Sequence, residues 1–154
     1  MTFLKLFPWR GTCSFLIFLF GVIICHYTGS RGVFPIDSFS HYDSGYRILN
    51  GEHPFRDYWI VSGFFIDYVQ SIIFYLLGTN WQVYLLNASI LNGLTALLVY
   101  KLFNKLRLDF KLSFFYAIWF AILAYPSSGT PFVDHHSALL SLVAIIFLIL
   151  ALEK

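Results

Sequence analysis

The chain has 154 residues, of which 58% are hydrophobic, 21% are aromatic and only 12% are charged. Soluble domains carry about 25% charged residues, so this composition excludes an ordinary soluble domain. The formal net charge of +2 is small and the chain has no basic run, which excludes nucleic acid as a partner. The composition therefore predicts a membrane protein.

Four apolar segments predict a single membrane domain, all-α, with about four transmembrane helices and short interfacial helices in its first outer loop. The predicted spans cover residues 11–28, 81–100, 112–125 and 136–152, and the outer loop covers residues 29–78. A spanning helix needs about 20 residues, but the third span reaches only about 21 Å. We therefore expect residues 126–134 to dip into the outer leaflet under cover of protein or water.

The segment 59–78 decides the topology, because it is apolar and aromatic but carries Asp67 and Gln70. An Asp at the bilayer centre costs about 2.5–3.5 kcal/mol on insertion scales. We therefore expect an interfacial helix that leaves Asp67 exposed to water. Lys5 and Arg10 before the first span then favour a cytoplasmic N-terminus. Charge counting also allows five spans with the N-terminus outside.

Most of the eight carboxylates fall on the predicted outer side, which indicates an acidic site at the water boundary. They are Asp37, Asp43, Glu52, Asp57, Asp67 and Asp134. Asp37 opens a helix expected over residues 38–50, where a carboxylate serves as N-cap, general base or metal ligand. Arg56 and Asp57 lie in a turn, where pairing with each other or with the neighbours of Asp37 would orient the loop.

Asp134, His135 and His136 form the densest polar cluster, at the mouth of the last span. They are either an N-cap with two boundary histidines, or an acid–base group or metal ligands. Adjacent histidines on a regular helix cannot both face one metal ion, so a divalent metal would use Asp134 with only one of the two histidines. No His-x-x-x-His or Cys-x-x-Cys spacing occurs in the sequence, which argues against a closed zinc site.

Two stripes of small and polar residues predict helix–helix contacts within the spans. The stripe on the second span consists of Ser89, Asn92 and Ala96, and that on the last span consists of Ser137, Ser141 and Ala144. Packing explains both stripes without a functional role.

The order of these pieces resembles the first outer loop of GT-C glycosyltransferases, which use polyprenyl-phosphate sugars. The matching pieces are Asp37 with His41, the helix to Gly51, Pro54-Phe55-Arg56-Asp57-Tyr58 and Leu76-Leu77-Gly78. The superfamily includes the protein O-mannosyltransferases and the lipid A aminoarabinose transferases, and Asp134 resembles its second acidic position. The match covers nearly all of this chain but only the N-terminal third of a typical member. Ser38 and His41 depart from the pattern, because many members have Glu and Tyr there.

The resemblance implies sugar transfer from a polyprenyl-phosphate donor to an acceptor on the outer side of a bacterial inner membrane. Asp37 would be the general base, and Asp134 with His136 would hold a divalent metal ion. The other implied substrate-binding residues are Asp134, His135, Arg56, Asp57 and His41. A complete enzyme needs more spans, so we expect an incomplete copy with little activity alone, or one that a second polypeptide completes.

Two alternatives come from other functional classes. A small non-catalytic membrane subunit would use the acidic loop to bind a protein or an ion. A transporter fragment would line an ion path with Asp67 and Asp134, which requires residues 59–78 to cross the membrane.

Overall fold

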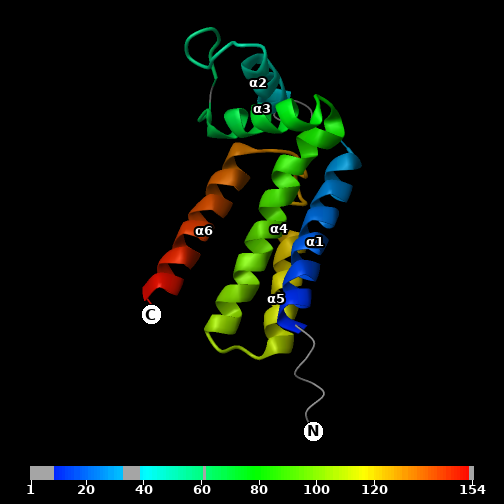
Figure 1. Ribbon diagram of the computed structural model, residues 1–154, viewed down its shortest axis with the longest axis vertical. Coiled ribbons are helices and arrows are strands. Elements are labelled where there is room, and N and C mark those ends of the chain that lie inside the picture. The colour runs from blue at the N-terminus through cyan, green and yellow to red at the C-terminus, as the bar shows by residue number, and fades with distance from the viewer. Residues whose placement is uncertain (1–8, 33–38, 61, 153–154) are drawn as a thin grey trace.

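The computed structural model describes residues 9–32, 39–60 and 62–152, and these residues form six helices and no strand (Figure 1). The helices are α1 (Trp9–Ser30), α2 (Ser40–Leu49), α3 (Phe65–Leu77), α4 (Trp81–Lys105), α5 (Phe110–Leu123) and α6 (Val133–Leu152). The predicted all-α class is therefore confirmed.

The four helices α1, α4, α5 and α6 form the long body of the molecule. Three segments are long and apolar enough to cross a membrane, namely Gly11–Ser30, Trp81–Lys105 and Val133–Leu152. The remaining helix, α5, is apolar but has only 14 residues. The start of α1, the α4–α5 turn and the end of α6 lie at the same end of the body (Figure 1). This arrangement indicates a multi-pass integral membrane protein.

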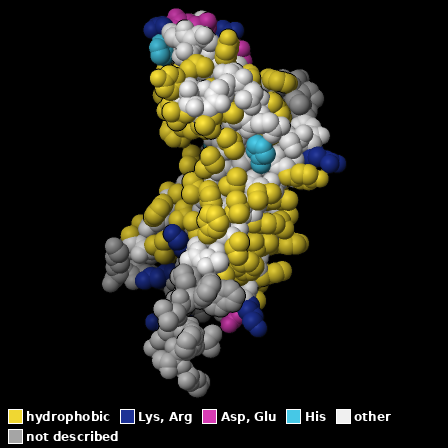
Figure 2. Space-filling view, turned by 45° about the vertical axis from the view of Figure 1, so that its right-hand side comes forward, with side chains coloured by type: hydrophobic (Ala, Val, Ile, Leu, Met, Phe, Trp, Pro, Cys, Tyr) yellow, Lys and Arg dark blue, Asp and Glu magenta, His cyan; other side chains and the backbone are white. Residues whose placement is uncertain are grey.

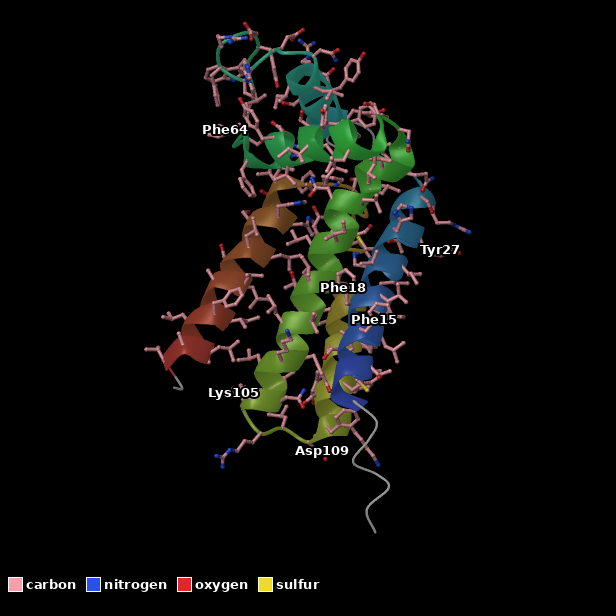
Figure 3. The ribbon with its side chains drawn as sticks, in the orientation of Figure 1. Phe15, Phe18, Tyr27, Phe64, Lys105 and Asp109 are labelled. Carbon is pink, nitrogen blue, oxygen red and sulfur yellow. The ribbon has the colours of Figure 1, made fainter. Side chains whose placement is uncertain are left out.

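On the face shown in Figure 2, apolar side chains cover much of this helical body, and charged side chains lie toward its two ends. On α1, Phe15 and Tyr27 point away from the other helices and are largely exposed (Figure 3). Lys105 and Asp109 mark the turn between α4 and α5 (Figure 3). An apolar outer surface between polar ends suits a bilayer, in which lipid takes the place of water.

The face of α4 that carries Ser89, Asn92 and Ala96 is fully buried, so the predicted contact on this helix is confirmed. The Asn92 amide Nδ2 donates to the carbonyl oxygen of Gly21 on α1 at 2.9 Å and to that of Ala121 on α5 at 3.0 Å. One side chain therefore joins three helices.

Gly93, the next residue on α4, lets α1 approach closely. A Cβ atom at this position would lie 2.7 Å from the Phe18 carbonyl oxygen and 2.8 Å from Cγ2 of Val22. Real Cβ atoms do not tolerate such distances, so only glycine permits this helix crossing.

The predicted stripe on α6 is wrong as a contact, because Ser137, Ser141 and Ala144 are all exposed. The buried residues of α6 are His136, Leu139 and Ile146. These lie on another face of the helix, and the apolar residues rather than the small ones meet the rest of the protein.

Helices α2 and α3 lie across one end of the long helices (Figure 1). They pack tightly on each other, since a Cβ on Gly45 of α2 would lie 2.9 Å from Cγ of Gln70 on α3. The segment predicted as an interfacial helix does form a helix, although this helix begins at Phe65 rather than at Trp59; its position at a membrane interface stays a prediction. The expectation that Asp67 is exposed to water is wrong, because its side chain faces α2 and only 1% of it is accessible.

The segment between α5 and α6 folds back into the protein instead of running over the surface. Tyr125, Thr130 and Pro131 are buried. Gly129 adopts a positive φ of 66°, and its backbone lies directly against Gly29 of α1. Protein therefore covers residues 129–131, while Ser127 and Asp134 are exposed, and the predicted dip of this segment into the outer leaflet stays a prediction.

Candidate functional site

A cavity of about 500 Å³ lies beside α2 and α3, at the end of the molecule that these helices cover. Its wall comes from three stretches of chain: α2, the residues that lead into α3 with Asp67 of α3 itself, and the start of α6. The lining residues that the structure describes include Asp43 and Asp67 but no Lys or Arg. The cavity therefore has an acidic wall.

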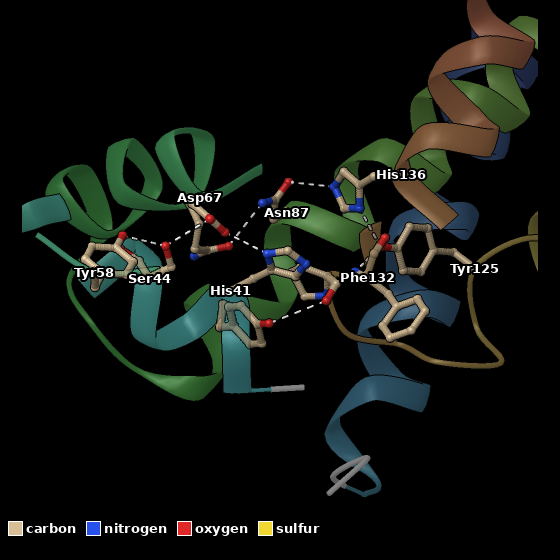
Figure 4. Close-up of polar contacts among 11 residues, drawn as sticks. His41, Ser44, Tyr58, Asp67, Asn87, Tyr125, Phe132 and His136 are labelled. Atoms are coloured by element: carbon tan, nitrogen blue, oxygen red, sulfur yellow. Dashed lines mark hydrogen bonds and ion pairs between the residues drawn. The ribbon is translucent and has the colours of Figure 1, made fainter. Parts of the chain in front are cut away.

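A buried carboxylate–histidine pair forms part of this wall (Figure 4). The Nδ1 atom of His41 lies 2.6 Å from Oδ1 of Asp67. The hydroxyl of Ser44 donates to the other carboxylate oxygen, Oδ2, at 2.9 Å. All three side chains are buried. These hydrogen bonds replace the water that a buried carboxylate loses, which explains how Asp67 can lie inside the protein.

The helical spacing of α2 produces this arrangement. His41 and Ser44 are three residues apart, so both lie on the face of α2 that meets α3. Gly45 on the same face has no side chain and lets α3 approach. Asp67, in the first turn of α3, thereby comes within reach of both polar side chains.

Tyr58 extends the polar group toward the loop. Its hydroxyl lies 2.6 Å from Oγ of Ser44, and the Arg47 guanidinium sits 5.1 Å from the centre of its ring. Burial raises the pKa of the Tyr58 hydroxyl, and its hydrogen bond with Ser44 offsets only part of that rise. The phenol is therefore protonated at neutral pH and can donate.

A second chain of polar contacts runs beneath the cavity (Figure 4). Asn87 Nδ2 donates to Gln70 Oε1 at 3.1 Å, and His136 Nε2 lies 3.2 Å from Asn87 Oδ1. His136 Nδ1 lies 2.6 Å from the Tyr125 hydroxyl, which accepts from the backbone N–H of Phe132 at 2.8 Å. Because Phe132 lines the cavity, this chain of contacts holds one of its walls.

The donor directions along this second chain are fixed. Since Asn87 Nδ2 donates to Gln70, its Oδ1 accepts, so Nε2 of His136 carries the proton. The Tyr125 hydroxyl then donates to Nδ1 of His136. Gln70 Nε2 is left buried without a hydrogen-bond partner in the described part of the chain.

An apolar groove of about 200 Å³ lies between α3, α4 and α6. Phe65, Ile66 and Val69 line it from α3, and its polar groups are Asn87 and His136. Helix α3 therefore separates two spaces, with Asp67 in the wall of the acidic cavity and apolar side chains toward the groove.

The site residues expected from the sequence are only partly brought together. Asp37, the expected base, lies outside the described residues. His41 lines the cavity. Arg56 and Asp57 pair with each other at 2.6 Å in the loop, as expected, and neither is part of the described lining.

The Arg56–Asp57 pair organises the loop itself. The hydrogen bond from Arg56 lowers the pKa of Asp57, and the bond from the backbone N–H of His53 lowers it further. That N–H donates at 2.7 Å, while Nδ1 of His53 lies 2.8 Å from the Tyr68 hydroxyl of α3. The pair thus has a structural role in attaching the loop to α3.

The three residues at the start of α6 point in different directions. Asp134 is exposed, the His135 ring packs 5.2 Å from the Tyr125 ring, and His136 is buried. Residues two apart on a helix face away from each other, so Asp134 and His136 do not converge on one point. Over residues 9–32, 39–60 and 62–152, no three His, Cys, Asp or Glu side chains form a group that could hold a metal ion.

Sequence reasoning missed Ser44, Tyr58 and the pairing of Asp67 with His41. The signal was present, because His41 and Ser44 share a helical face and Asp67 is the only carboxylate in an otherwise apolar helix. What the sequence did not show is that these two faces meet. No family model, curated protein or solved structure matches the chain.

Proposed function

We propose that this chain is a GT-C-like membrane protein that transfers a sugar from a polyprenyl-phosphate donor to an acceptor on the outer side of the membrane. The observation that supports this most is the acidic cavity, with its buried His41–Asp67 pair at the end of apolar helices. Acid–base side chains at a water boundary suit a reaction that must remove a proton from the acceptor. The order of the sequence motifs supports the same function.

The arrangement around α3 supports a lipid-linked donor. A polyprenyl chain is a long hydrocarbon, and the groove between α3, α4 and α6 is lined almost entirely by apolar side chains. The acidic cavity lies on the other side of α3. A donor beside this helix would keep its chain in an apolar environment and its sugar near the polar groups.

The donor phosphate needs positive charge, which the described cavity wall lacks. Arg47 is already bound to Asp43 and Glu52, and Arg56 to Asp57. Arg31, whose guanidinium donates to the Tyr27 hydroxyl, is the local arginine that has no carboxylate partner among the described residues. We therefore assign the phosphate to Arg31 or to a partner polypeptide.

In this proposal the membrane is a bacterial inner membrane, with the N-terminus and the α4–α5 turn in the cytoplasm. That orientation places Lys101, Lys105, Arg107 and Lys111 inside, in agreement with the positive-inside tendency. It also places the cavity outside, where an acceptor in the cell envelope would reach it.

The test is sugar transfer in membranes of the cell that makes the chain, supplied with radiolabelled polyprenyl-phosphate sugars. Asp37→Asn and Asp67→Asn should each lower transfer at least tenfold relative to wild type. Asp57→Asn is the control, since that carboxylate serves the loop and should leave most transfer intact. Transfer that is unchanged in both Asp37→Asn and Asp67→Asn would contradict the proposal.

A non-catalytic subunit is the second candidate, and the absence of Lys and Arg from the described cavity wall favours it. It predicts that Asp37→Asn and Asp67→Asn leave the function of the complex intact. The transporter alternative has less support, because α3 lies across the ends of the long helices and Asp134 does not join Asp67 in the described cavity wall.

A further inference from the structure

We propose that His41 is a proton acceptor for a ligand in the cavity, that Asp67 is its positioning residue, and that the ligand carries a hydroxyl or an amine rather than an anionic group. This inference rests on the proposed sugar transfer, because it names His41, in place of the Asp37 that the resemblance implies, as the group that takes the acceptor's proton, and it names the class of that acceptor. It involves a histidine where the sequence departs from the GT-C pattern.

In this proposal Asp67 is ionised, and its contact with His41 sets the tautomer of that histidine. An ionised carboxylate can only accept, so the 2.6 Å contact with Asp67 Oδ1 places a proton on Nδ1 of His41. In a neutral imidazole, Nε2 then keeps its lone pair. A carboxylate that holds a histidine in this way both orients the ring and stabilises the imidazolium after it takes up a proton.

The neighbouring hydroxyls keep Asp67 in its accepting role. Ser44 donates its single proton to Asp67 Oδ2 at 2.9 Å. With that proton used, Tyr58 is the donor to Ser44, to its Oγ at 2.6 Å and to its carbonyl oxygen at 3.2 Å. Each oxygen of the Asp67 carboxylate therefore accepts a hydrogen bond, Oδ1 from His41 and Oδ2 from Ser44.

The remaining nitrogen of His41 is available to the cavity. The His41 side chain lines the cavity while its Nδ1 edge is turned to Asp67 on α3. Nε2 has no hydrogen-bond partner within residues 9–32, 39–60 and 62–152. A hydroxyl or amine that enters the cavity can donate its proton to this atom.

The charge of the cavity wall selects the class of acceptor. Asp43 and Asp67 both contribute carboxylates, and the described lining contains no Lys or Arg to offset them. Only Asp43 has a guanidinium partner, Arg47, at 2.7 Å. A phosphate or carboxylate acceptor would be repelled, whereas a neutral hydroxyl or an amine would not. Tyr58, Trp59 and Phe132 add aromatic faces that suit a sugar or a cationic amine.

The reaction step balances without any further reagent. The acceptor oxygen or nitrogen forms a bond to the anomeric carbon of the donor sugar, and the bond from that carbon to the phosphate oxygen breaks. The electron pair leaves with the polyprenyl phosphate. The proton of the acceptor moves to Nε2 of His41, which becomes an imidazolium beside Asp67.

The competing explanation is that the pair only joins α2 to α3. A purely structural contact would also bury both residues and would place the same proton on Nδ1, so burial, stability and that proton do not separate the two roles. Loss of transfer in His41→Gln and a changed pH profile do, while a proton on Nε2 would exclude the base. A base requires the proton on Nδ1 and a lone pair on Nε2, and it requires Asp67 to enforce that state.

The first experiment measures the tautomer of His41 by 15N NMR of histidine-labelled protein in lipid nanodiscs at pH 8, with His41→Gln to assign the signal. Wild type should give a single tautomer with a proton on Nδ1. Asp67→Asn should give a mixture, because an amide both donates and accepts, whereas Asp43→Asn should leave the wild-type signal. A proton on Nε2 in wild type would overturn the proposal without any use of activity.

The second experiment measures transfer in the membranes described above. His41→Gln should lower transfer by about 100-fold, within the range for loss of a general base, and Asp67→Asn by at least tenfold with a changed pH profile. Transfer in His41→Gln within twofold of wild type would overturn the role of His41 while leaving sugar transfer in place. If wild type itself transfers no sugar, the proposed function fails, and the role of His41 as the base of that transfer fails with it.

Discussion

Helices α4 and α6 carry similar stripes of small and polar residues, yet the protein uses them in different ways. In the apolar window of α4, 61% of residues are buried, against 17% in that of α6. The stripe on α4 lies between α1 and α5, whereas the stripe on α6 is exposed.

The difference shows that small residues alone do not fix a helix contact in a membrane. On α4 they accompany a glycine at a helix crossing and an asparagine whose amide reaches two other helices. On α6 no side chain of the stripe reaches another helix. Instead α6 is held at its first turns by His136, through Asn87 and Tyr125.

The largest loss of stability should come from a substitution at the crossing of α1 and α4. Gly93→Val would place side-chain atoms inside the space of the Phe18 carbonyl oxygen and Val22. Overpacking of this kind costs about 3 kcal/mol at the upper end of its usual range. Unfolding in mixed detergent micelles should show this loss. Gly32→Val is the control, since no atom of the described residues lies within 4 Å of its Cβ position; equal stability of the two variants would refute the role of the crossing.

An intermediate loss of stability is expected where His136 attaches α6 to the rest of the protein. His136→Phe keeps a ring but leaves Asn87 Oδ1 and the Tyr125 hydroxyl without their partner. Loss of buried hydrogen bonds costs roughly 1–3 kcal/mol. Hydrogen exchange should also rise at the Phe132 amide, which Tyr125 holds. His135→Phe serves as the control and should change neither quantity, so equal effects at the two histidines would contradict this account of α6.

The smallest change in stability should come from the exposed stripe on α6. Ser141→Leu places a larger apolar side chain on an exposed face of α6, and we expect stability within about 0.5 kcal/mol of wild type. Ser89→Leu makes the same change at a fully buried position of α4 and should cost about 1–3 kcal/mol. The pair is measured in the same micelle assay. A cost at Ser141 as large as that at Ser89 would mean that α6 has a partner on this face.

The helices themselves were predictable from the sequence, because hydropathy and length define them. The contact face of α4 was predictable too, since Ser89, Asn92 and Ala96 recur at helical spacing. The prediction that Ser141 lies in a helix–helix contact failed for a physical reason. Periodicity shows which residues share a face, but it does not show which neighbour, if any, meets that face.

The environment of Asp67 was the main error at the candidate site. A carboxylate in an apolar helix indicates a polar environment, and water was the simplest one to expect. The protein supplies that environment itself with His41 and Ser44. Those residues are more than 20 positions away in the chain, so local spacing does not reveal their proximity. The expected roles of Asp37 in catalysis and of the GT-C pattern as a whole stay predictions.

The contact between Gly29 and Gly129 links the membrane-spanning part of the protein to the cavity. Two backbones touch there without intervening side chains, so even a methyl group at either glycine would push the end of α1 and the returning segment apart. Because Phe132, only three residues after Gly129, lines the cavity, such a displacement would also reshape the wall that a ligand meets.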